Sequence, residues 1–500
     1  MLVSAELLLY YQRCDRRAFL DVFGNPRQKD PLDDFLIKLR QDSHAHRQIE
    51  LTQYDYHQPK WRPDDWLGGT EATLELMEQG VECIYGGVLS ASWLPGITLI
   101  CQPDLLVRET GSSALGSWYY VPKEIKFGKR PKLDYQIVSA FDGLVLSLVQ
   151  GIWPPTAWLL LRGRQPHLVD FDKRVPEMHR ILHDCIATLR HHRTPDLFLS
   201  RQKCNLCHWY SSCHAIAEQQ HHLSLVPGVT PNRYEQLRSM GIETLEALAQ
   251  SSLSQLKGAF GGEVGEQLSQ QAKAAFSQQA IPKLPEIDRL VREYSHRWFD
   301  VPEASVEIHF DIEAEPDLDL DFLLGALAID RVTGTQQYFA FLAETPGEEG
   351  KIWQEFLDLL WAYPDAPIYH FCDYEVKTVQ RLAKLYRTPS HRWKPVLDRC
   401  VDVHWWVTQT VVLPVESYAL KPIARWVGFD WRDRNANGAQ CICWYNQWLD
   451  TGDRRYLDAI VRYNEDDCRA TYDLKNWLVQ FLKPLYDASL SPSVIPSPLG

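Results

Sequence analysis

The 500-residue sequence lacks several features that would place it in a common class of proteins. It has no Gly-x4-Gly-Lys-Ser/Thr loop, which excludes an ATP-driven motor of its own. It has no internal repeat of fixed period, so we do not expect a solenoid or a propeller. Its best match to a membrane span, residues 144–161, is interrupted by Gln150, Pro154 and Pro155. That interruption favours a buried helix followed by a strand.

The chain also has no excess of basic residues and no basic start. Its formal net charge is −13, which excludes a surface covered in basic side chains, although local basic patches can still bind phosphate. The first residues, Met1–Glu6, include no Lys or Arg, so we expect no secretory signal peptide and a cytoplasmic location. In a reducing compartment, the 12 cysteines are expected to be buried thiols or metal ligands instead of disulfides.

The length and the apolar content of 45% predict a multidomain α/β protein with roughly three domains. Helical periodicity alternates with β-rich runs such as Val81–Tyr85 in the first part, and Val306–Glu313 alternates with the period of a strand in the second. The expected segments are an α/β domain over 1–217, short helices over 218–283, a linker over 284–300, a second α/β domain over 301–485 and a disordered tail over 486–500.

The strongest local signal in the first domain is Asp104 after Pro103, followed on the next expected strand by Glu124-Ile125-Lys126. Glu124 and Lys126 are two residues apart on a strand, so both point to one face, where they can meet Asp104 from the neighbouring strand. The two carboxylates suit Mg²⁺ or Mn²⁺, and a lysine can orient or deprotonate a water that attacks phosphorus. The alternative is a solvated strand face.

The surroundings of this motif favour a site that meets phosphate. A basic run surrounds it: Lys123, Lys126, Lys129, Arg130 and Lys132. Downstream, Gln136 lies at the start of an amphipathic helix that we expect to run to Leu148. Upstream, His46 lies on an expected helix and is a candidate metal ligand. The alternative is an ordinary surface or core histidine, and His44 competes for the role.

Cysteines bracket the first domain. The four expected ligands are Cys14, Cys204, Cys207 and Cys213. Four thiolates drawn from both ends can close the domain around one metal centre, either an iron–sulfur cluster or zinc. A second arrangement stays open, in which zinc is held by three cysteines with His208 or His214, and Cys14 is only buried.

One set of these residues carries a family resemblance: Cys14, His46, Asp104, Glu124, Lys126, Gln136, Cys204, Cys207 and Cys213. It resembles the RecB-type nucleases of the PD-(D/E)xK superfamily, and more narrowly the iron–sulfur branch that includes CRISPR-associated and AddB-type nucleases. The resemblance implies a restriction-endonuclease-like fold and a 4Fe–4S cluster on the four cysteines. The metal ligands and catalytic lysine it implies are His46, Asp104, Glu124, the Ile125 carbonyl and Lys126. Nucleic-acid contacts are expected for Gln136, Lys129 and Arg130.

The sequence departs from that family's pattern at two positions. Arg47 follows His46 where the family often has Glu, and Ala140 stands where the family has a tyrosine. The first departure bears on the alignment of His46, and the second bears on substrate contacts more than on catalysis.

The middle of the chain, Leu225-Val226-Pro227-Gly228-Val229 and the apolar pattern that follows, resembles a helix-hairpin-helix element. In such an element the hairpin amides around Gly228 would contact phosphate without reading bases. An apolar helical pair that serves as a spacer is the alternative.

The second domain carries a different set of acids. Asp311 and Glu313 share one face of an expected strand, and Glu375 begins a helix directly after another strand, near a sheet edge. Tyr463 and Asp467 are four residues apart within a long helical pattern, so both project from one face of the helix. Four acidic groups can hold two metal ions about 4 Å apart, which clamp the attacking and leaving oxygens of a phosphodiester.

The order of these motifs is similar to that of the DEDD exonucleases with an RNase H-like fold. The resemblance covers Asp311-x-Glu313, then His370-x3-Tyr374-Glu375, and last Tyr463-x3-Asp467. The tyrosine four residues before the last acid points to the subgroup that uses it to position water. His370 and Glu375 depart from the usual Asn and Asp, and Glu remains a competent but longer ligand.

Taken together, the two domains resemble a bacterial group of RecB-like nucleases that carry a C-terminal ribonuclease H-like domain. This resemblance implies Mg²⁺- or Mn²⁺-dependent hydrolysis of DNA ends or single strands, with RNA as a second substrate, in repair, recombination or defence. A separate helicase is an expected partner. Two rival hypotheses stay open: only the C-terminal exonuclease cuts and the first domain binds DNA, or the whole chain is a non-catalytic scaffold for a helicase.

Overall fold

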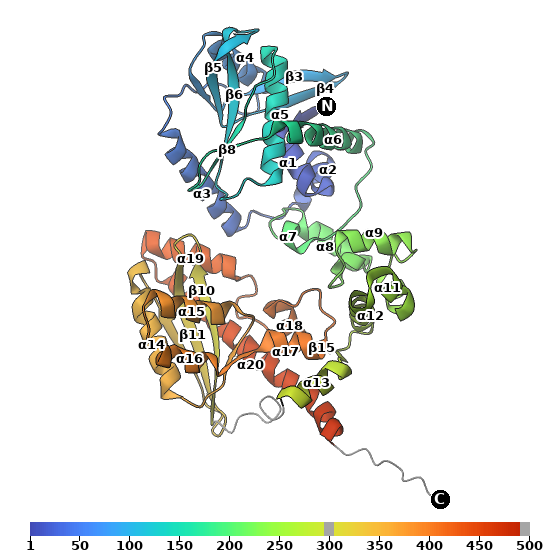
Figure 1. The fold of residues 1–500 in the computed structure, drawn as a ribbon, viewed down its shortest axis with the longest axis vertical. Coiled ribbons are helices and arrows are strands. Elements are labelled where there is room, and N and C mark those ends of the chain that lie inside the picture. Colours follow the sequence, from blue (N-terminus) through green and yellow to red (C-terminus); the bar gives the residue numbers. More distant parts are fainter. Residues whose placement is uncertain (295–304, 491–500) are drawn as a thin grey trace, which may run out of the picture. The chain divides into compact units, whose positions relative to one another are not determined.

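The structure is a computed structural model that describes residues 1–294 and 305–490 (Figure 1). The chain divides into two compact units, Met1–Ala217 and Glu218–Gly500. Within the described residues, no helix combines the length and the apolar character needed to cross a bilayer. The stretch 144–161 instead forms the end of a buried helix and a short strand, as the sequence predicts.

The N-terminal unit contains two sheets and the helices that cover them. Its strands are β1 (Leu2–Ser4), β2 (Cys83–Tyr85), β3 (Leu89–Leu94), β4 (Ile97–Cys101), β5 (Leu105–Ser113), β6 (Gly116–Lys126), β7 (Trp158–Leu161) and β8 (His167–Leu168). Its helices are α1 (Ala5–Arg13), α2 (Asp15–Phe23), α3 (Asp34–Leu51), α4 (Trp66–Glu78), α5 (Leu133–Gln150), α6 (Phe171–Arg190), α7 (Arg201–Cys204) and α8 (Tyr210–Gln219), the last of which continues past the unit boundary.

The five-stranded sheet of this unit has the order β2-β5-β6-β7-β8, and the three-stranded sheet has the order β1-β4-β3. Helix α5 packs against β6 of the first sheet and against β3 and β4 of the second. Its sequence is apolar almost all round, and nearly every side chain from Gln136 to Leu146 is buried, as expected of a central helix. This packing places the middle of α5 next to the end of β6, the strand that carries Glu124.

The C-terminal unit begins with short helices and continues into a sheet with helices on both faces. Its helices are α9 (Pro231–Ser239), α10 (Leu245–Gln250), α11 (Leu253–Phe260), α12 (Gly262–Ser277), α13 (Leu284–Tyr294), α14 (Glu349–Ala362), α15 (Tyr374–Leu385), α16 (Ser390–Leu397), α17 (Val403–Thr410), α18 (Leu420–Trp426), α19 (Gly438–Thr451) and α20 (Arg455–Leu490). Its strands are β9 (Ile281–Pro282), β10 (Val306–Glu315), β11 (Leu320–Asp330), β12 (Gln336–Leu342), β13 (Ile368–His370), β14 (Cys400–Asp402) and β15 (Val411–Val412).

The main sheet has the order β12-β11-β10-β13-β14. The first three strands form an antiparallel meander, whereas β10, β13 and β14 run parallel and are joined through helices. Helix α14 packs against β11 and β12, and the long helix α20 packs against β10 and β11 (Figure 1). The central strand β10 therefore has both faces covered.

The two faces of β10 differ in chemistry because side chains alternate along a strand. Ile308, Phe310 and Ile312 belong to the apolar core under α14, where the Phe310 and Phe356 rings are 5.3 Å apart. The odd-numbered positions are polar and face α20 and α19: Glu307, His309, Asp311, Glu313 and Glu315. Burying a row of ionisable groups is costly unless each finds a partner, so this face is a candidate for a functional site.

Two sequence-based boundaries need correction. Residues 284–294, expected as part of a linker, form helix α13, because Ile287 and Leu290 are buried in a core with α17 and α20. Helix α20 extends to Leu490, past the expected start of the tail at 486. The rest of the expected linker, 295–300, and of the expected tail, 491–500, lie outside the described residues.

Candidate active sites

Three carboxylates meet where β10 faces α20. Asp311 and Glu313 project from the same face of β10, as the strand period predicts, and Asp467 projects from α20. One carboxylate oxygen from each lies within 4.8 Å of the others, and Glu313 and Asp467 are buried. Acids from two distant parts of the sequence thus share one small volume, which suits a divalent cation with oxygen ligands.

A polar contact fixes the position of α20 against the sheet at this point. Asn464 donates a hydrogen bond from Nδ2 to Asp311 Oδ2 at 2.8 Å, and Tyr338 donates from its hydroxyl to Asn464 Oδ1 at 2.8 Å. Gly325 lies opposite Asp311 on β11, and a Cβ there would come within 1.7 Å of Asn464 Oδ1. Only glycine leaves room for the asparagine, so Gly325 is part of the architecture of the site.

The electrostatics of the three acids follow from their burial. Burial and the neighbouring charges of Asp467, Glu313 and Glu375 raise the pKa of Asp311 well above its usual range. Burial and the charge of Asp467 do the same to the pKa of Glu313. Burial raises the pKa of Asp467 to about 7, although hydrogen bonds from Trp431 and Tyr463 oppose the rise. Like charges held together without water favour either protons or a cation between them.

Glu375 is the fourth predicted acid of this site. It lies in the first turn of α15, is buried, and its Oε2 atom has no hydrogen-bond partner. His370 Nδ1 lies 3.6 Å from that oxygen and donates a 2.6 Å hydrogen bond to the Cys372 carbonyl. Cys372 has a φ of 73°, which is uncommon for a residue with a side chain. The turn before α15 is thus strained where it precedes a buried carboxylate, whose charge contributes to the raised pKa of Asp311.

Tyr463 and two residues that the sequence did not single out complete this cluster. Trp431 Nε1 donates a hydrogen bond to Asp467 Oδ1 at 2.6 Å. Lys421 places its ammonium 4.8 Å from the centroid of the Tyr463 ring. The charge of Lys421 lowers the pKa of Asp467 and of Glu313, which opposes the larger effect of burial. Lys421 is therefore a cation next to the acidic cluster, on the side of Tyr463.

The N-terminal cluster also forms, but its charges are paired. Asp104, directly before β5, accepts a 2.7 Å hydrogen bond from the Ile125 amide, and its other oxygen lies 2.7 Å from Arg47 Nε. Lys126 pairs with Glu124 on the same face of β6 and lies 3.8 Å from Asp104. Although burial acts to lower the pKa of Lys126, the charges of Glu124 and Asp104 raise it above its usual range. Two cations thus face two carboxylates.

A buried acid that sequence reasoning missed adjoins this cluster. Asp142, in the middle of α5, is almost fully buried and hydrogen-bonded to Glu124. Burial and the charge of Glu124 raise the pKa of Asp142 well above its usual range, and burial also raises the pKa of Glu124. The pair therefore holds a proton more readily than isolated acids do.

The remaining predicted residues of the N-terminal site lie apart from the acids. His46, Asp104 and Glu124 do not form a group with ligand atoms within 4.8 Å of one another in the described part of the chain. Buried His46 instead lies 6.1 Å from the Phe127 ring, and its Nε2 has no hydrogen-bond partner. Burial lowers the pKa of His46, which favours the neutral form of its ring.

The predicted nucleic-acid contacts differ in accessibility. Gln136 is buried, donates to the Pro131 carbonyl at 2.8 Å and accepts from Arg174 Nε at 3.0 Å, which explains its position through packing. Lys129 and Arg130 are exposed in the loop after β6. These two cations can meet a phosphate backbone.

The four predicted cysteines line one small cavity of the N-terminal unit, together with Arg16, Arg17 and Trp209. No three of the four sulfur atoms lie within 4.8 Å of one another, among the residues that the structure describes. Burial raises the pKa of all four thiols: Cys14, Cys204, Cys207 and Cys213. Arg17 and Arg16 act in the opposite direction on Cys207 and Cys213. The cysteines are gathered, but they are not packed tightly around one point.

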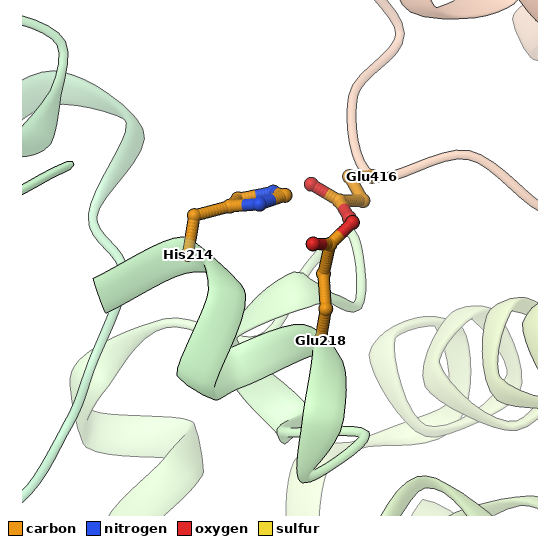
Figure 2. A group of neighbouring side chains, drawn as sticks. All are labelled: His214, Glu218 and Glu416. Carbon is orange, nitrogen blue, oxygen red and sulfur yellow. The ribbon is translucent and has the colours of Figure 1, made fainter. Parts of the chain in front are cut away.

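Neither of the two histidines considered as zinc ligands lines the cysteine cavity. His208 Nε2 lies 2.6 Å from Asp21 Oδ1, which also accepts a hydrogen bond from Trp209. His214 does not line the cysteine cavity, and Figure 2 shows its ring on the same helix as Glu218, one turn apart. Neither arrangement supports a three-cysteine, one-histidine zinc site.

The hairpin in the middle of the chain has the expected turn. Gly228 has a φ of 91°, a left-handed conformation that favours glycine, and it precedes α9, whose N-cap is Thr230. Arg233 donates a 2.7 Å hydrogen bond to the Gly228 carbonyl. The helical region docks on the rest of its unit through Gln271, which donates to the Leu413 carbonyl at 2.6 Å. The phosphate contact at Gly228 stays a prediction.

Comparison with known proteins identifies one of these regions. A family model described as the RNase H superfamily matches residues 308–479, which hold β10, α20 and the three clustered acids. This part of the chain is an RNase H superfamily domain with an acidic triad compatible with a nuclease site. The match does not extend into residues 1–217, whose fold is unassigned. No curated protein matches the chain.

Proposed function

We propose that the C-terminal unit is a metal-dependent nuclease that hydrolyses phosphodiester bonds at Asp311, Glu313, Glu375 and Asp467. The observation that carries this proposal is the acidic triad within 4.8 Å, largely buried, without a basic residue among its members. Carboxylates in that state fit a divalent cation such as Mg²⁺ or Mn²⁺, because its charge replaces the protons that burial would otherwise impose. The unpartnered Glu375 Oε2 supplies a further oxygen ligand at the edge of the triad.

Each surrounding residue has a task in this reaction. Bound divalent cations would polarise the phosphodiester and stabilise the attacking and leaving oxygens. Asn464 fixes the orientation of Asp311, and Trp431 fixes that of Asp467, through the hydrogen bonds described above. The Tyr463 hydroxyl, beside Asp467, can orient the attacking water, since the tyrosine keeps its proton: burial and the charge of Asp467 raise its pKa far above neutral pH.

A direct assay tests this proposal. Purified full-length protein is incubated with end-labelled single-stranded DNA, duplex DNA and RNA, with Mg²⁺, with Mn²⁺ and with EDTA. We expect metal-dependent degradation that Asp311→Asn abolishes and that the matched exposed variant Asp365→Asn leaves unchanged. Degradation that survives EDTA, or that Asp311→Asn leaves intact, would contradict the proposal. The same gels give the polarity and the preferred substrate.

A second nuclease site of the PD-(D/E)xK type, in the N-terminal unit, is the second candidate. The convergence of Asp104, Glu124 and Lys126 favours it. Against it, Arg47 and Lys126 neutralise the acids, and His46 is not gathered with them. We therefore propose that this unit binds nucleic acid, with Lys129 and Arg130 on its surface, and that the C-terminal site does most of the cutting. Residual cleavage in Asp311→Asn that Asp104→Asn removes would establish a second active site.

The cysteine cavity is proposed to hold a metal centre. Tetrahedral zinc, with Zn–S bonds of about 2.3 Å, brings sulfurs within about 3.8 Å of one another. The wider spacing here favours an iron–sulfur cluster, which holds its four thiolates further apart, and Arg16 and Arg17 offset its negative charge. Anaerobically purified protein should be brown and contain iron. Colourless protein with one equivalent of zinc would contradict this assignment.

For the substrate and the partner, we propose DNA ends or single strands and a separate helicase. The exposed cations of the N-terminal unit and the hairpin before α9 support binding to a phosphate backbone. The chain has no P-loop, so any unwinding must come from another protein. The rival, a non-catalytic scaffold, predicts DNA binding without metal-dependent degradation in the assay above.

A further inference from the structure

Lys421 is held in an unusual way beside the acidic cluster. It lies in the first turn of α18 and is half-buried. Its ammonium donates a hydrogen bond to the Ala436 carbonyl and lies over two ring faces, 4.8 Å from the centroid of Tyr463 and 5.3 Å from that of Trp431. Both aromatic residues contact Asp467. The cation is therefore fixed one side chain away from an acid of the triad.

The contacts of Lys421 leave its charge available. Its partners are one carbonyl oxygen and two aromatic faces, so in the described part of the chain it has no carboxylate with which to form an ion pair. An ammonium has three N–H donors, and the carbonyl uses one of them. The buried Lys475 of this unit, by contrast, is paired, because it donates to both oxygens of Glu307 at 2.9 Å. An unpaired, partly desolvated cation beside a set of acids is costly unless it serves an anionic ligand.

We infer that Lys421 is a substrate-binding residue that contacts a non-bridging oxygen of the scissile phosphate. The inference rests on the proposed nuclease function of the same site. A phosphate that enters the acidic cluster with its cations would reach Lys421 along the side of Tyr463, and the two rings hold the ammonium in place before the substrate arrives. Charge stabilisation by a preorganised donor in a partly dry site is worth far more than in water.

A purely structural role for Lys421 is the competing explanation, in which it only ties α18 to Tyr463 and Trp431. The two explanations differ in their dependence on substrate charge. Contact with one phosphate of a single strand contributes about 0.7 to the slope of log affinity against log salt concentration, and a structural lysine contributes nothing.

The test compares full-length wild type, Lys421→Gln, Lys421→Arg and the exposed control Lys351→Gln. Single-stranded DNA affinity is measured against NaCl concentration with Ca²⁺ in place of Mg²⁺, and single-turnover cleavage is measured with Mg²⁺. The same measurements are made with DNA that carries one uncharged methylphosphonate at the terminal linkage of the cleaved end. Thermal unfolding is recorded for every variant.

We expect Lys421→Gln to lower the cleavage rate about 100-fold and the salt slope by about 0.7, with Lys351→Gln unchanged. On methylphosphonate DNA, Lys421→Gln should have no further effect on affinity, because the charge that it contacts is gone. Lys421→Arg should keep the salt slope. If either variant changes affinity for native and methylphosphonate DNA by the same factor, Lys421 is structural and the inference fails.

These results are separable from the proposed function. If wild type cuts no nucleic acid, the nuclease proposal fails, while the salt slope still decides whether Lys421 contacts phosphate. If wild type cuts and Lys421→Gln cuts equally well, only the inference about Lys421 fails. Should Lys421→Gln not fold, Lys421→Met, which keeps the length of the side chain without its charge, is measured on the two DNAs in its place.

Discussion

The two acidic clusters begin from nearly the same sequence pattern and reach opposite electrostatic states. Each has two polar residues spaced two apart on one strand face: Glu124 and Lys126 on β6, and Asp311 and Glu313 on β10. In the first, Lys126 and a guanidinium from α3 pair with the carboxylates. In the second, a third acid comes from α20, as Asp142 comes from α5 in the first, but within the described residues no Lys or Arg forms an ion pair with any of the three.

The difference teaches that the number of carboxylates is a poor guide to metal binding and that their partners matter more. Buried carboxylates already paired with Lys and Arg gain little from a divalent cation, because its charge would displace charges that are already there. Carboxylates that raise one another's pKa gain most. The C-terminal triad is thus the better fit for a divalent cation, and each prediction changes one side of this contrast.

The largest effect is expected from removing an acid of each cluster in turn. Asp311→Asn removes a ligand and one negative charge, and loss of several kcal/mol of charge stabilisation corresponds to a fall in cleavage of about 1,000-fold. Asp104→Asn should lower cleavage less than about threefold, since its site is proposed to bind and not to cut. Initial rates on end-labelled single-stranded DNA measure both. Equal losses of activity in the two variants would contradict the proposed difference between the two acidic clusters.

A second prediction concerns the buried pair that adjoins the C-terminal acids on β10. The pair is Glu307 and Lys475. Although burial acts to raise the pKa of Glu307, hydrogen bonding from His309 and the charge of Lys475 lower it to about 2, so the pair is ionised. Lys475→Met leaves a buried charge without its partner, and we expect a loss of about 3 kcal/mol in the free energy of unfolding. Urea denaturation measures it, with exposed Lys351→Met as the control. A loss under about 1 kcal/mol would contradict the role of this pair.

Gly325→Ala tests how α20 is held against the sheet. The new methyl group would collide with Asn464 Oδ1 and would also lie 2.6 Å from the Tyr338 hydroxyl. We expect a loss of about 2 kcal/mol in stability and a weaker affinity for Mn²⁺, because Asn464 can no longer orient Asp311. Thermal unfolding and calorimetry measure the two. Gly438→Ala, whose new methyl group meets nothing within 4 Å, is the matched control. An equal response from the two variants would mean that Gly325 is not needed to hold Asn464 in place.

The pH dependence of metal binding follows from the raised pKa of Asp467. In the folded, metal-free protein this acid keeps its proton up to about pH 7, whereas its ordinary pKa is 3.8. The unfolded chain therefore binds fewer protons across that window, and stability of the metal-free protein falls as pH rises through it. A cation must displace the proton, so Mn²⁺ affinity should rise by up to about tenfold per pH unit below neutrality and then level off. Calorimetry in buffers of different ionisation enthalpy measures the released protons; affinity that is flat across this range would refute the raised pKa.

The smallest expected effect comes from releasing the N-terminal acids. Arg47→Gln removes the cation that lies 2.7 Å from Asp104. In an Asp311→Asn background, where the C-terminal site is disabled, we expect this change to strengthen Mn²⁺ binding about tenfold, because Asp104 loses a competing charge. Arg40→Gln, an exposed arginine on the same helix, should have no effect. No gain in Arg47→Gln would mean that pairing is not what keeps the metal out.

Much of the C-terminal fold and site could be predicted from the sequence. Strand periodicity predicted β10 within two residues of its observed ends, and it put Asp311 and Glu313 on one face. Spacing in a helix put Tyr463 on the same side as Asp467. These are local regularities, and local regularities are what a sequence displays directly.

The residues that sequence reasoning missed depend on contacts between distant segments. Asn464 is one of several polar residues on α20, and only the approach of β11 at Gly325 makes it the residue that reaches Asp311. Lys421 follows an ordinary Tyr-Ala-Leu stretch, and nothing local marks it as a neighbour of Asp467. Asp142 lies in the middle of a helix whose pattern predicts an apolar buried face. An acid at such a position is uncommon, and it indicated a buried polar contact.

The most direct test of the contrast is calorimetric titration of full-length wild type, Asp104→Asn and Asp311→Asn with Mn²⁺ at neutral pH. We predict that Asp104→Asn binds Mn²⁺ as wild type does and that Asp311→Asn loses the tightest binding. Loss of that binding in Asp104→Asn, with Asp311→Asn unaffected, would contradict this prediction.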